Sequence, residues 1–223
     1  MTTEVSMMHS AESQNLKDGE VSTGTTIIAI PFQGGVVVGA DSRTSTGSYV
    51  AVRTSDKIAC LSDHIYACRS GSAADTQALT DYIRYYLQQL KIETGRPARV
   101  KSAAHLLQKL VYQNKDNLSA GMIVAGWDPV EGPAIYSIAL GGTCLKVPFA
   151  FSGSGSLYIT GLLDSEFREN MTKEEARTLV KKALAHAMAR DGSSGGIIRT
   201  VAITAEGNDR DYTSQLPYGP VSY

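Results

Sequence analysis

Long hydrophobic runs are missing from this sequence, and no stretch approaches the length that a membrane-spanning helix needs. An excess of one charge is missing as well, because 21 basic residues stand against 22 acidic ones and leave a formal net charge of −1. A chain without a global positive field does not hold a phosphate backbone. These absences predict a soluble globular protein that binds neither membranes nor nucleic acid.

Cysteine is scarce, and the three that occur, Cys60, Cys68 and Cys144, are widely spaced in apolar stretches. An odd number with such spacing is typical of reduced thiols that pack as small core residues. Residues 1–20 carry no continuous apolar segment of the kind found in a secretory signal. The sequence therefore predicts a protein of the cytoplasm and nucleus.

Several common catalytic motifs are also missing. There is no Gly-x-Ser-x-Gly elbow, no His-Glu-x-x-His, no Walker loop and no Cys-x-x-Cys. The four histidines show no metal-ligand spacing. Neither a metal nor another cofactor is expected.

The chain reads as one domain with a polar leader. Residues 1–24 lack helical or strand periodicity and end in Ser22-Thr23-Gly24, so the ordered domain should begin at Thr25. A chain of 223 residues is long enough for one domain with a sizeable core. At the other end, a tail without clear period is expected from about residue 209.

Hydrophobic periodicity divides the domain into strands and helices. Strands are expected at 26–32, 35–41, 49–53, 57–61, 65–69, 122–125, 134–140, 145–151 and 197–204. Helices are expected from near Ser72, over 101–113, and after the capping box Thr172-Lys-Glu-Glu175. This order is not a regular alternation, so it favours an α+β fold in which helices cover antiparallel sheets.

Candidate chemistry is sparse when each motif is considered alone. Asp41 ends an apolar strand and Lys57 begins another, so the two charges can face one another across a sheet. Gly/Ser-rich segments occur at 70–72, 153–155 and 191–196. Strand-end charges are commonly solvated or paired structurally, and such segments commonly serve as connections. Composition and spacing leave both interpretations open.

Six segments of the sequence, taken in order along the chain, resemble motifs of proteasome beta subunits. They are Thr23-Gly-Thr-Thr-Ile-Ile-Ala-Ile, Gly39-Ala-Asp-Ser-Arg-Thr, Asp56-Lys57, Cys68-Arg-Ser-Gly-Ser-Ala-Ala-Asp75, Gly153-Ser-Gly-Ser and Asp191-Gly-Ser-Ser-Gly-Gly. The match spans residues 23 to 204 and is most similar to the caspase-like catalytic type. It implies the N-terminal-nucleophile hydrolase fold, a four-layer αββα sandwich of two antiparallel sheets between helices.

The resemblance also implies roles for individual residues. Thr25 corresponds to the nucleophile, which is freed when residues 1–24 are removed by cleavage between Gly24 and Thr25. Asp41 and Lys57 correspond to its charged partners. The resemblance assigns the shell that orders the nucleophile's amine and a water molecule to Ser154, Asp191 and Ser194.

The chemistry of these roles is physically sound. A threonine hydroxyl needs a base, and the α-amine of the same residue, with a reference pKa of about 7.7–8.0, can serve once it is free. Lys57 beside it disfavours a second positive charge. The Gly71 N–H is expected to donate to the developing oxyanion. While Gly24 is attached the nitrogen is an amide, so autocatalytic maturation is expected.

Substrate preference is expected to depend on Arg69, at the position that resembles the base of the family's main specificity pocket. A guanidinium binds a carboxylate bidentately, which favours cleavage after acidic residues. The alternative is that Arg69 only pairs with an acid such as Asp75. The substrate backbone is expected to pair with segments around Ser45 and from Gly71 to Ala73.

The sequence thus predicts a threonine endopeptidase subunit that degrades unfolded polypeptides within stacked seven-membered rings of other alpha and beta subunits. One alternative is a structural beta subunit without activity. Another is a stand-alone N-terminal-nucleophile amidase that acts on small molecules. Retention of Gly24, Thr25, Asp41 and Lys57 argues against a scaffold, which has no chemical need for that set.

Overall fold

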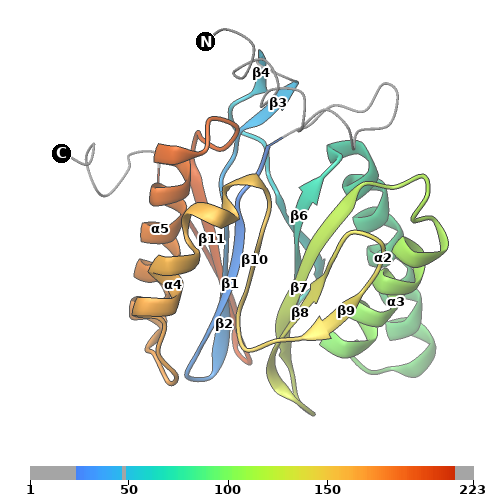
Figure 1. The fold of residues 1–223 in the computed structure, drawn as a ribbon. Coiled ribbons are helices and arrows are strands. Elements are labelled where there is room, and N and C mark those ends of the chain that lie inside the picture. The colour runs from blue at the N-terminus through green and yellow to red at the C-terminus, as the bar shows by residue number, and fades with distance from the viewer. Residues whose placement is uncertain (1–23, 47–48, 214–223) are drawn as a thin grey trace, which may run out of the picture.

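The protein is built as four layers (Figure 1). The computed structural model describes residues 24–46 and 49–213. Two five-stranded antiparallel sheets lie face to face, and helices cover the outer face of each. The predicted α+β sandwich is therefore confirmed. The predicted leader, Gly24 excepted, and residues 214–223 of the predicted tail lie outside the described residues.

The first sheet contains the first two strands after Thr25, and its order is β10-β1-β2-β11-β12. Its strands are β1 (Ile27–Phe32), β2 (Gly35–Ala40), β10 (Ala150–Ser152), β11 (Ile198–Thr204) and β12 (Gly207–Thr213). In β1, Ile28 and Ile30 face the helices while Ile27 and Ala29 face the second sheet. Both faces of β1 are covered, which explains its continuous apolar sequence.

The second sheet has the order β5-β6-β7-β8-β9. Its strands are β5 (Ile58–Ser62), β6 (Ile65–Gly71), β7 (Ala120–Asp128), β8 (Gly132–Ile138) and β9 (Cys144–Lys146). A separate hairpin of β3 (Thr44–Thr46) and β4 (Tyr49–Val52) follows β2.

The two longest helices begin at residues whose side chains cap them. The helices are α2 (Ala73–Thr94), α3 (Val100–Gln113), the 3-10 helix η2 (Ser154–Tyr158), α4 (Thr160–Glu166) and α5 (Lys173–Arg190). Ser72 caps α2, and Gly95 ends it in the left-handed conformation. Thr172 and Glu175 form the predicted capping box of α5.

Three hydrophobic clusters fill the three spaces between the four layers. One joins α2 and α3 to the second sheet, one joins α4 and α5 to the first sheet, and the third lies between the sheets. Strand β7 shows the division, because Met122 and Val124 belong to the first cluster and Ile123 and Ala125 to the third. The sheets therefore meet through an apolar interface that fixes the relative positions of their strand ends.

The predictions for residues 145–151 and for Cys60 were wrong. The single strand expected at 145–151 is two strands, β9 and β10, which belong to different sheets and are separated by a connection containing Pro148. Proline lacks the N–H that a continuous ladder would need. Cys60 is exposed rather than packed in the core, whereas Cys68 is buried and Cys144 is half-buried.

The chain from residue 209 is not an irregular tail as far as Thr213. Strand β12 pairs with β11 over seven residues, from Gly207 to Thr213. Apart from the exposed Tyr212, its residues are polar or glycine, so it lacks the apolar alternation that would reveal a strand. Instead, Asp209 pairs with Lys173 and Arg177 of α5, and Asp211 pairs with Lys181. Backbone pairing and these ion pairs hold β12 in place.

The described residues contain neither a candidate membrane span nor a candidate metal cluster. None of their helices is long and apolar enough to cross a membrane. Across residues 24–46 and 49–213, no three or more His, Cys, Asp and Glu side chains are grouped so that they could hold a metal ion.

Candidate active site

The candidate site lies where strands of both sheets begin or end, near the N-terminal end of β1. Thr25 precedes β1 by two residues, Asp41 directly follows β2, Lys57 directly precedes β5, and Gly71 ends β6. These residues come from separate parts of the chain, and the stacking of the sheets brings them to one place.

The Lys57 ammonium connects the predicted nucleophile to the predicted acid. Its Nζ donates to Asp41 Oδ1 at 2.8 Å, to Thr25 Oγ1 at 3.0 Å and to the Gly24 carbonyl at 3.0 Å. The Thr25 hydroxyl itself donates to the Gly24 carbonyl. An ammonium has three donors, so this set uses all of them.

The Lys57–Asp41 ion pair is buried, and this burial affects the pKa of Lys57. Asp41 is fully buried and Lys57 is 5% exposed. Burial lowers the pKa of Lys57, against the attraction of Asp41 and Asp191, and the charge of Arg43 lowers it further. Asp41 also accepts backbone N–H bonds, from Thr26 at 2.9 Å through Oδ1 and from Gly195 at 3.0 Å through Oδ2. The carboxylate is thus held by the backbone as well as by the cation.

A second network reaches the Thr25 nitrogen. Thr25 N donates to Ser154 Oγ at 3.1 Å, and Ser154 Oγ donates to Asp191 Oδ2 at 2.7 Å. Ser194 Oγ donates to the same carboxylate oxygen at 2.5 Å and lies 2.8 Å from Thr26 Oγ1. Of the predicted residues, Ser154 therefore contacts the Thr25 nitrogen directly, Asp191 contacts Ser154, and Ser194 contacts Asp191.

Arg69, Gly71 and Ala73 line one small cavity beside Thr25. It measures about 20 Å³ and is bounded by Thr25, Thr44, Ser55, Lys57, Arg69, Gly71, Ala73 and Thr76. Ser45 does not line this cavity and is buried in β3, next to Thr44. The structure therefore brings Arg69, Gly71 and Ala73 together with Thr25 and places Ser45 adjacent to them.

Arg69 lines this cavity, and only part of its guanidinium is hydrogen-bonded. Its Nη2 donates to the Asp56 carbonyl, whereas its buried Nε has no hydrogen-bond partner among the described residues. The proposed partner Asp75 instead accepts from Ser119 N at 3.0 Å, and the ion pairs of the described ranges include no Arg69–Asp75 pair. The Arg69–Asp75 pair named in that alternative is therefore absent from the described residues, and the acids whose charges act on Arg69 are Asp56 and Asp81.

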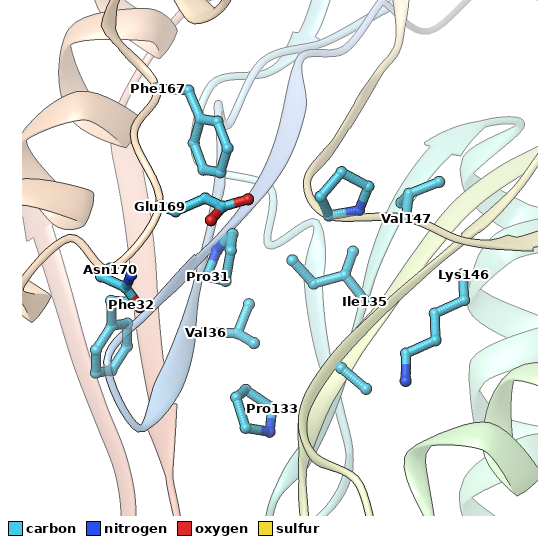
Figure 2. Close-up of a pocket in the computed structure, with 12 residues that line it drawn as sticks. Pro31, Phe32, Val36, Pro133, Ile135, Lys146, Val147, Phe167, Glu169 and Asn170 are labelled. Atoms are coloured by element: carbon cyan, nitrogen blue, oxygen red, sulfur yellow. The ribbon is translucent and has the colours of Figure 1, made fainter.

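A larger pocket of about 470 Å³ opens at the opposite end of β1 (Figure 2). Pro31 and Phe32 of β1 contribute to its walls, together with Pro133 and Ile135 of β8. Most of its lining is apolar, and it contains none of the predicted site residues. The smaller cavity is the better candidate because the predicted nucleophile, a buried cation and the predicted specificity residue all line it.

Gly153 lies directly against the Thr25 backbone, where there is no room for a side chain. Its φ is +95°, and a Cβ there would lie 2.1 Å from the Thr25 carbonyl oxygen. Gly34 has a similar φ of +88° but open space around it. We expect Gly34→Ala to cost only backbone strain of about 1–2 kcal/mol, or a few degrees in Tm. Gly153→Ala should lower Tm at least twice as much in thermal unfolding, and equal shifts would contradict the steric role.

Some residues of these networks were given no role from the sequence. Thr26 contacts Ser194, and Ser42 and Arg43 join Asp41 to the segment 192–197. Their positions in the sequence could have indicated a role, because Ser42 and Arg43 directly follow Asp41, and Thr26 directly follows Thr25. Nothing in their spacing distinguished a hydroxyl or guanidinium that closes a network from one that is solvated.

The four-layer sandwich, with a threonine hydroxyl at the head of its first strand, is the fold of the N-terminal-nucleophile hydrolases. Within that class, the family model described as "Proteasome subunit" matches residues 21–203. The chain therefore belongs to the proteasome subunit family, and its curated relatives place it among the beta subunits.

Three relatives illustrate the similarity. "Proteasome subunit beta type-6" of Arabidopsis thaliana is 56% identical over 195 residues, which are 87% of this chain and 84% of that protein. "Proteasome subunit beta type-1" of Saccharomyces cerevisiae is 51% identical over 87% of this chain and 90% of its own length. "Proteasome subunit beta type-9" of Homo sapiens is 48% identical over 86% and 87%. This family membership sets aside the stand-alone amidase.

Proposed function

We propose that this beta subunit is a threonine endopeptidase that cleaves after acidic residues. The observation that carries the proposal is the joint contact of Lys57 Nζ, at 3.0 Å each, with the Thr25 hydroxyl and the Gly24 carbonyl. This geometry puts the nucleophile next to a carbonyl and next to a cation that stabilises negative charge. A scaffold subunit would have no need for such a buried set.

The first bond to be cut is that between Gly24 and Thr25. In this proposal Thr25 Oγ1 forms a bond to the Gly24 carbonyl carbon, the C–N bond breaks, and the proton lost by the hydroxyl ends on the nitrogen, which becomes the amine. Water then hydrolyses the resulting ester and releases residues 1–24 as a peptide ending in the Gly24 carboxylate. Gly24 suits this turn because its φ is +58° and a Cβ would lie 2.3 Å from Ser193 Cβ.

The mature subunit then uses the same groups on substrate peptides. The free Thr25 amine takes the hydroxyl proton, Lys57 disfavours protonation of that amine, and Asp41 holds Lys57. The Ser154–Asp191–Ser194 network orients the amine, and the Gly71 N–H donates to the oxyanion. The substrate backbone lies along Ser45 and along the segment from Gly71 to Ala73.

Assembly and location complete the proposal. As the relatives are named proteasome subunits, we infer that the chain works in stacked rings with other alpha and beta subunits. Unfolded polypeptides are its substrates there, during ubiquitin-dependent degradation. All three cysteines are free thiols, which fits a reducing cytoplasm and nucleus.

Post-acidic specificity is tested by Arg69→Leu in the assembled particle. The Nε–H of Arg69 is a buried, unpaired donor at the cavity beside Thr25, and a substrate carboxylate would satisfy it. We expect kcat/KM for a peptide with Glu before the scissile bond to fall by about 10²-fold, with a gain for Leu at that position. Arg168→Leu, at an exposed arginine between α4 and α5, is the control. Unchanged preference for Glu would contradict the assignment.

A further inference from the structure

Arg43 lies next to the site but has no role in the chemistry proposed above. Its backbone N donates to Asp41 Oδ2 at 3.1 Å, and its Nη1 donates to the Gly192 carbonyl at 2.8 Å. The side chain therefore reaches from the end of β2 to the segment between α5 and β11. That segment carries Ser194 and follows Asp191, two members of the network at the Thr25 nitrogen.

Gly195 is shaped to receive the guanidinium. A Cβ on Gly195 would lie 2.4 Å from Arg43 Cζ and 2.5 Å from its second terminal nitrogen. The guanidinium thus lies directly against the glycine backbone, where any side chain would displace it. Gly195 N also donates to Asp41 Oδ2 at 3.0 Å, so one carboxylate oxygen holds both Gly195 and Arg43.

Ser42 extends the same clamp. Ser42 N donates to the Gly195 carbonyl at 3.0 Å, and Ile197 N donates to Ser42 Oγ at 2.7 Å. Ser42 Oγ in turn donates to the Arg53 carbonyl at 2.5 Å. Residues 41–43 are therefore joined to residues 192–197 by backbone and side-chain bonds on both sides.

From this geometry we infer that Arg43 is a positioning residue, which clamps the segment 192–197 so that Ser194 and Asp191 stay aligned with the Thr25 nitrogen. The inference rests on the proposed function for its kinetic effect only, because the clamp itself is a structural claim. A loosened segment would misplace the groups that orient the amine, and small displacements of such groups cost large factors in rate.

Arg43 also contributes charge. The charged groups that act on Lys57 are Asp41, Asp191 and Arg43, and of these only Arg43 lowers its pKa. Removing the Arg43 charge raises the pKa of Lys57, and by the same Coulomb effect that of the nearby Thr25 amine. The proposed reaction needs a neutral amine. With a raised amine pKa, the fall in activity on the acidic side of the pH profile would therefore occur at a higher pH.

Three variants of the assembled particle separate clamp from charge. Arg43→Met removes both, Arg43→Lys keeps the charge without the planar fork, and Gly195→Ala keeps Arg43 but displaces its guanidinium. We expect each to lower kcat by about tenfold or more, with KM within about twofold. Only Arg43→Met should move the acidic limb of kcat/KM to higher pH. Arg168→Met, at an exposed arginine between α4 and α5, should change neither.

A double-mutant cycle and hydrogen exchange complete the test. Arg43→Met removes the guanidinium carbon and terminal nitrogens that lie against Gly195, and the flexible end of methionine can move aside, so adding Gly195→Ala should cost little further, whereas independent effects would multiply. Amides of residues 193–197 should exchange faster in Arg43→Met, whether or not the particle cleaves acidic peptides. Unchanged exchange, or wild-type kcat per active site with an unmoved pH limb, would overturn the inference. If the wild-type particle does not cleave after acidic residues, the proposed function is refuted. Faster exchange in Arg43→Met would in that case still support the clamp.

Discussion

Replacing Thr25 by alanine should leave residues 1–24 attached to this subunit and abolish cleavage after acidic residues. The side chain supplies the oxygen that lies against the Gly24 carbonyl and accepts from Lys57. Loss of a nucleophile costs on the order of 10⁴-fold or more in kcat. Intact-mass measurement of the assembled particle and hydrolysis of a peptide with Glu before the scissile bond report the two effects separately.

Two further variants make the result specific to the hydroxyl. Thr25→Ser keeps the hydroxyl and should still mature and cleave, at a reduced rate. A Thr25→Ala chain produced without residues 1–24 has a free amine but no nucleophile and should be inactive. Removal of residues 1–24 from the full-length Thr25→Ala subunit, at the rate of the unaltered chain, would mean that another protease makes the cut.

The second large effect is expected at Lys57. Lys57→Met removes the donor to Thr25 Oγ1 and to the Gly24 carbonyl, so maturation and cleavage should fall by about 10²–10³-fold or more. It also leaves the fully buried Asp41 carboxylate without its cation. Breaking a buried pair in this way costs about 3–5 kcal/mol.

Catalytic and structural contributions separate in the double variant. Asp41→Asn combined with Lys57→Met removes the lone charge, so chemical denaturation should show much of the stability restored. Cleavage should remain absent, because the ammonium at Thr25 is still missing. Recovery of activity together with stability would show that the pair only supports the fold.

The sequence predicted the fold where local and tertiary preferences agreed. Apolar periodicity placed the helix that begins near Ser72, the capping box at Thr172 placed another helix start, and continuous apolar runs placed the strands that are covered on both faces. It failed where contacts between distant segments determine the structure. Strand β12 has no apolar period because ion pairs to α5 hold it, and the break at Pro148 depends on which sheet each half joins.

The candidate site could be predicted only in part from the sequence, because its residues are brought together by contacts between distant segments. Thr25, Asp41 and Lys57 were identified through a resemblance in several motifs, since their 16- and 32-residue separations carry no period. The clamp formed by Ser42 and Arg43 was not predicted, because it depends on a glycine 152 residues away from Arg43 that has no side chain to reveal it. Packing of two sheets, rather than any local pattern, creates this neighbourhood.

Strand β12 has a consequence for the subunit before it joins a particle. It forms the outer edge of the first sheet, and an unprotected edge is a template on which another chain can add a strand. Its charged residues Asp209, Arg210 and Asp211 are each tied by an ion pair to the rest of the fold. An incoming strand would have to disrupt or desolvate these pairs, so free subunits awaiting assembly are protected from edge-to-edge aggregation.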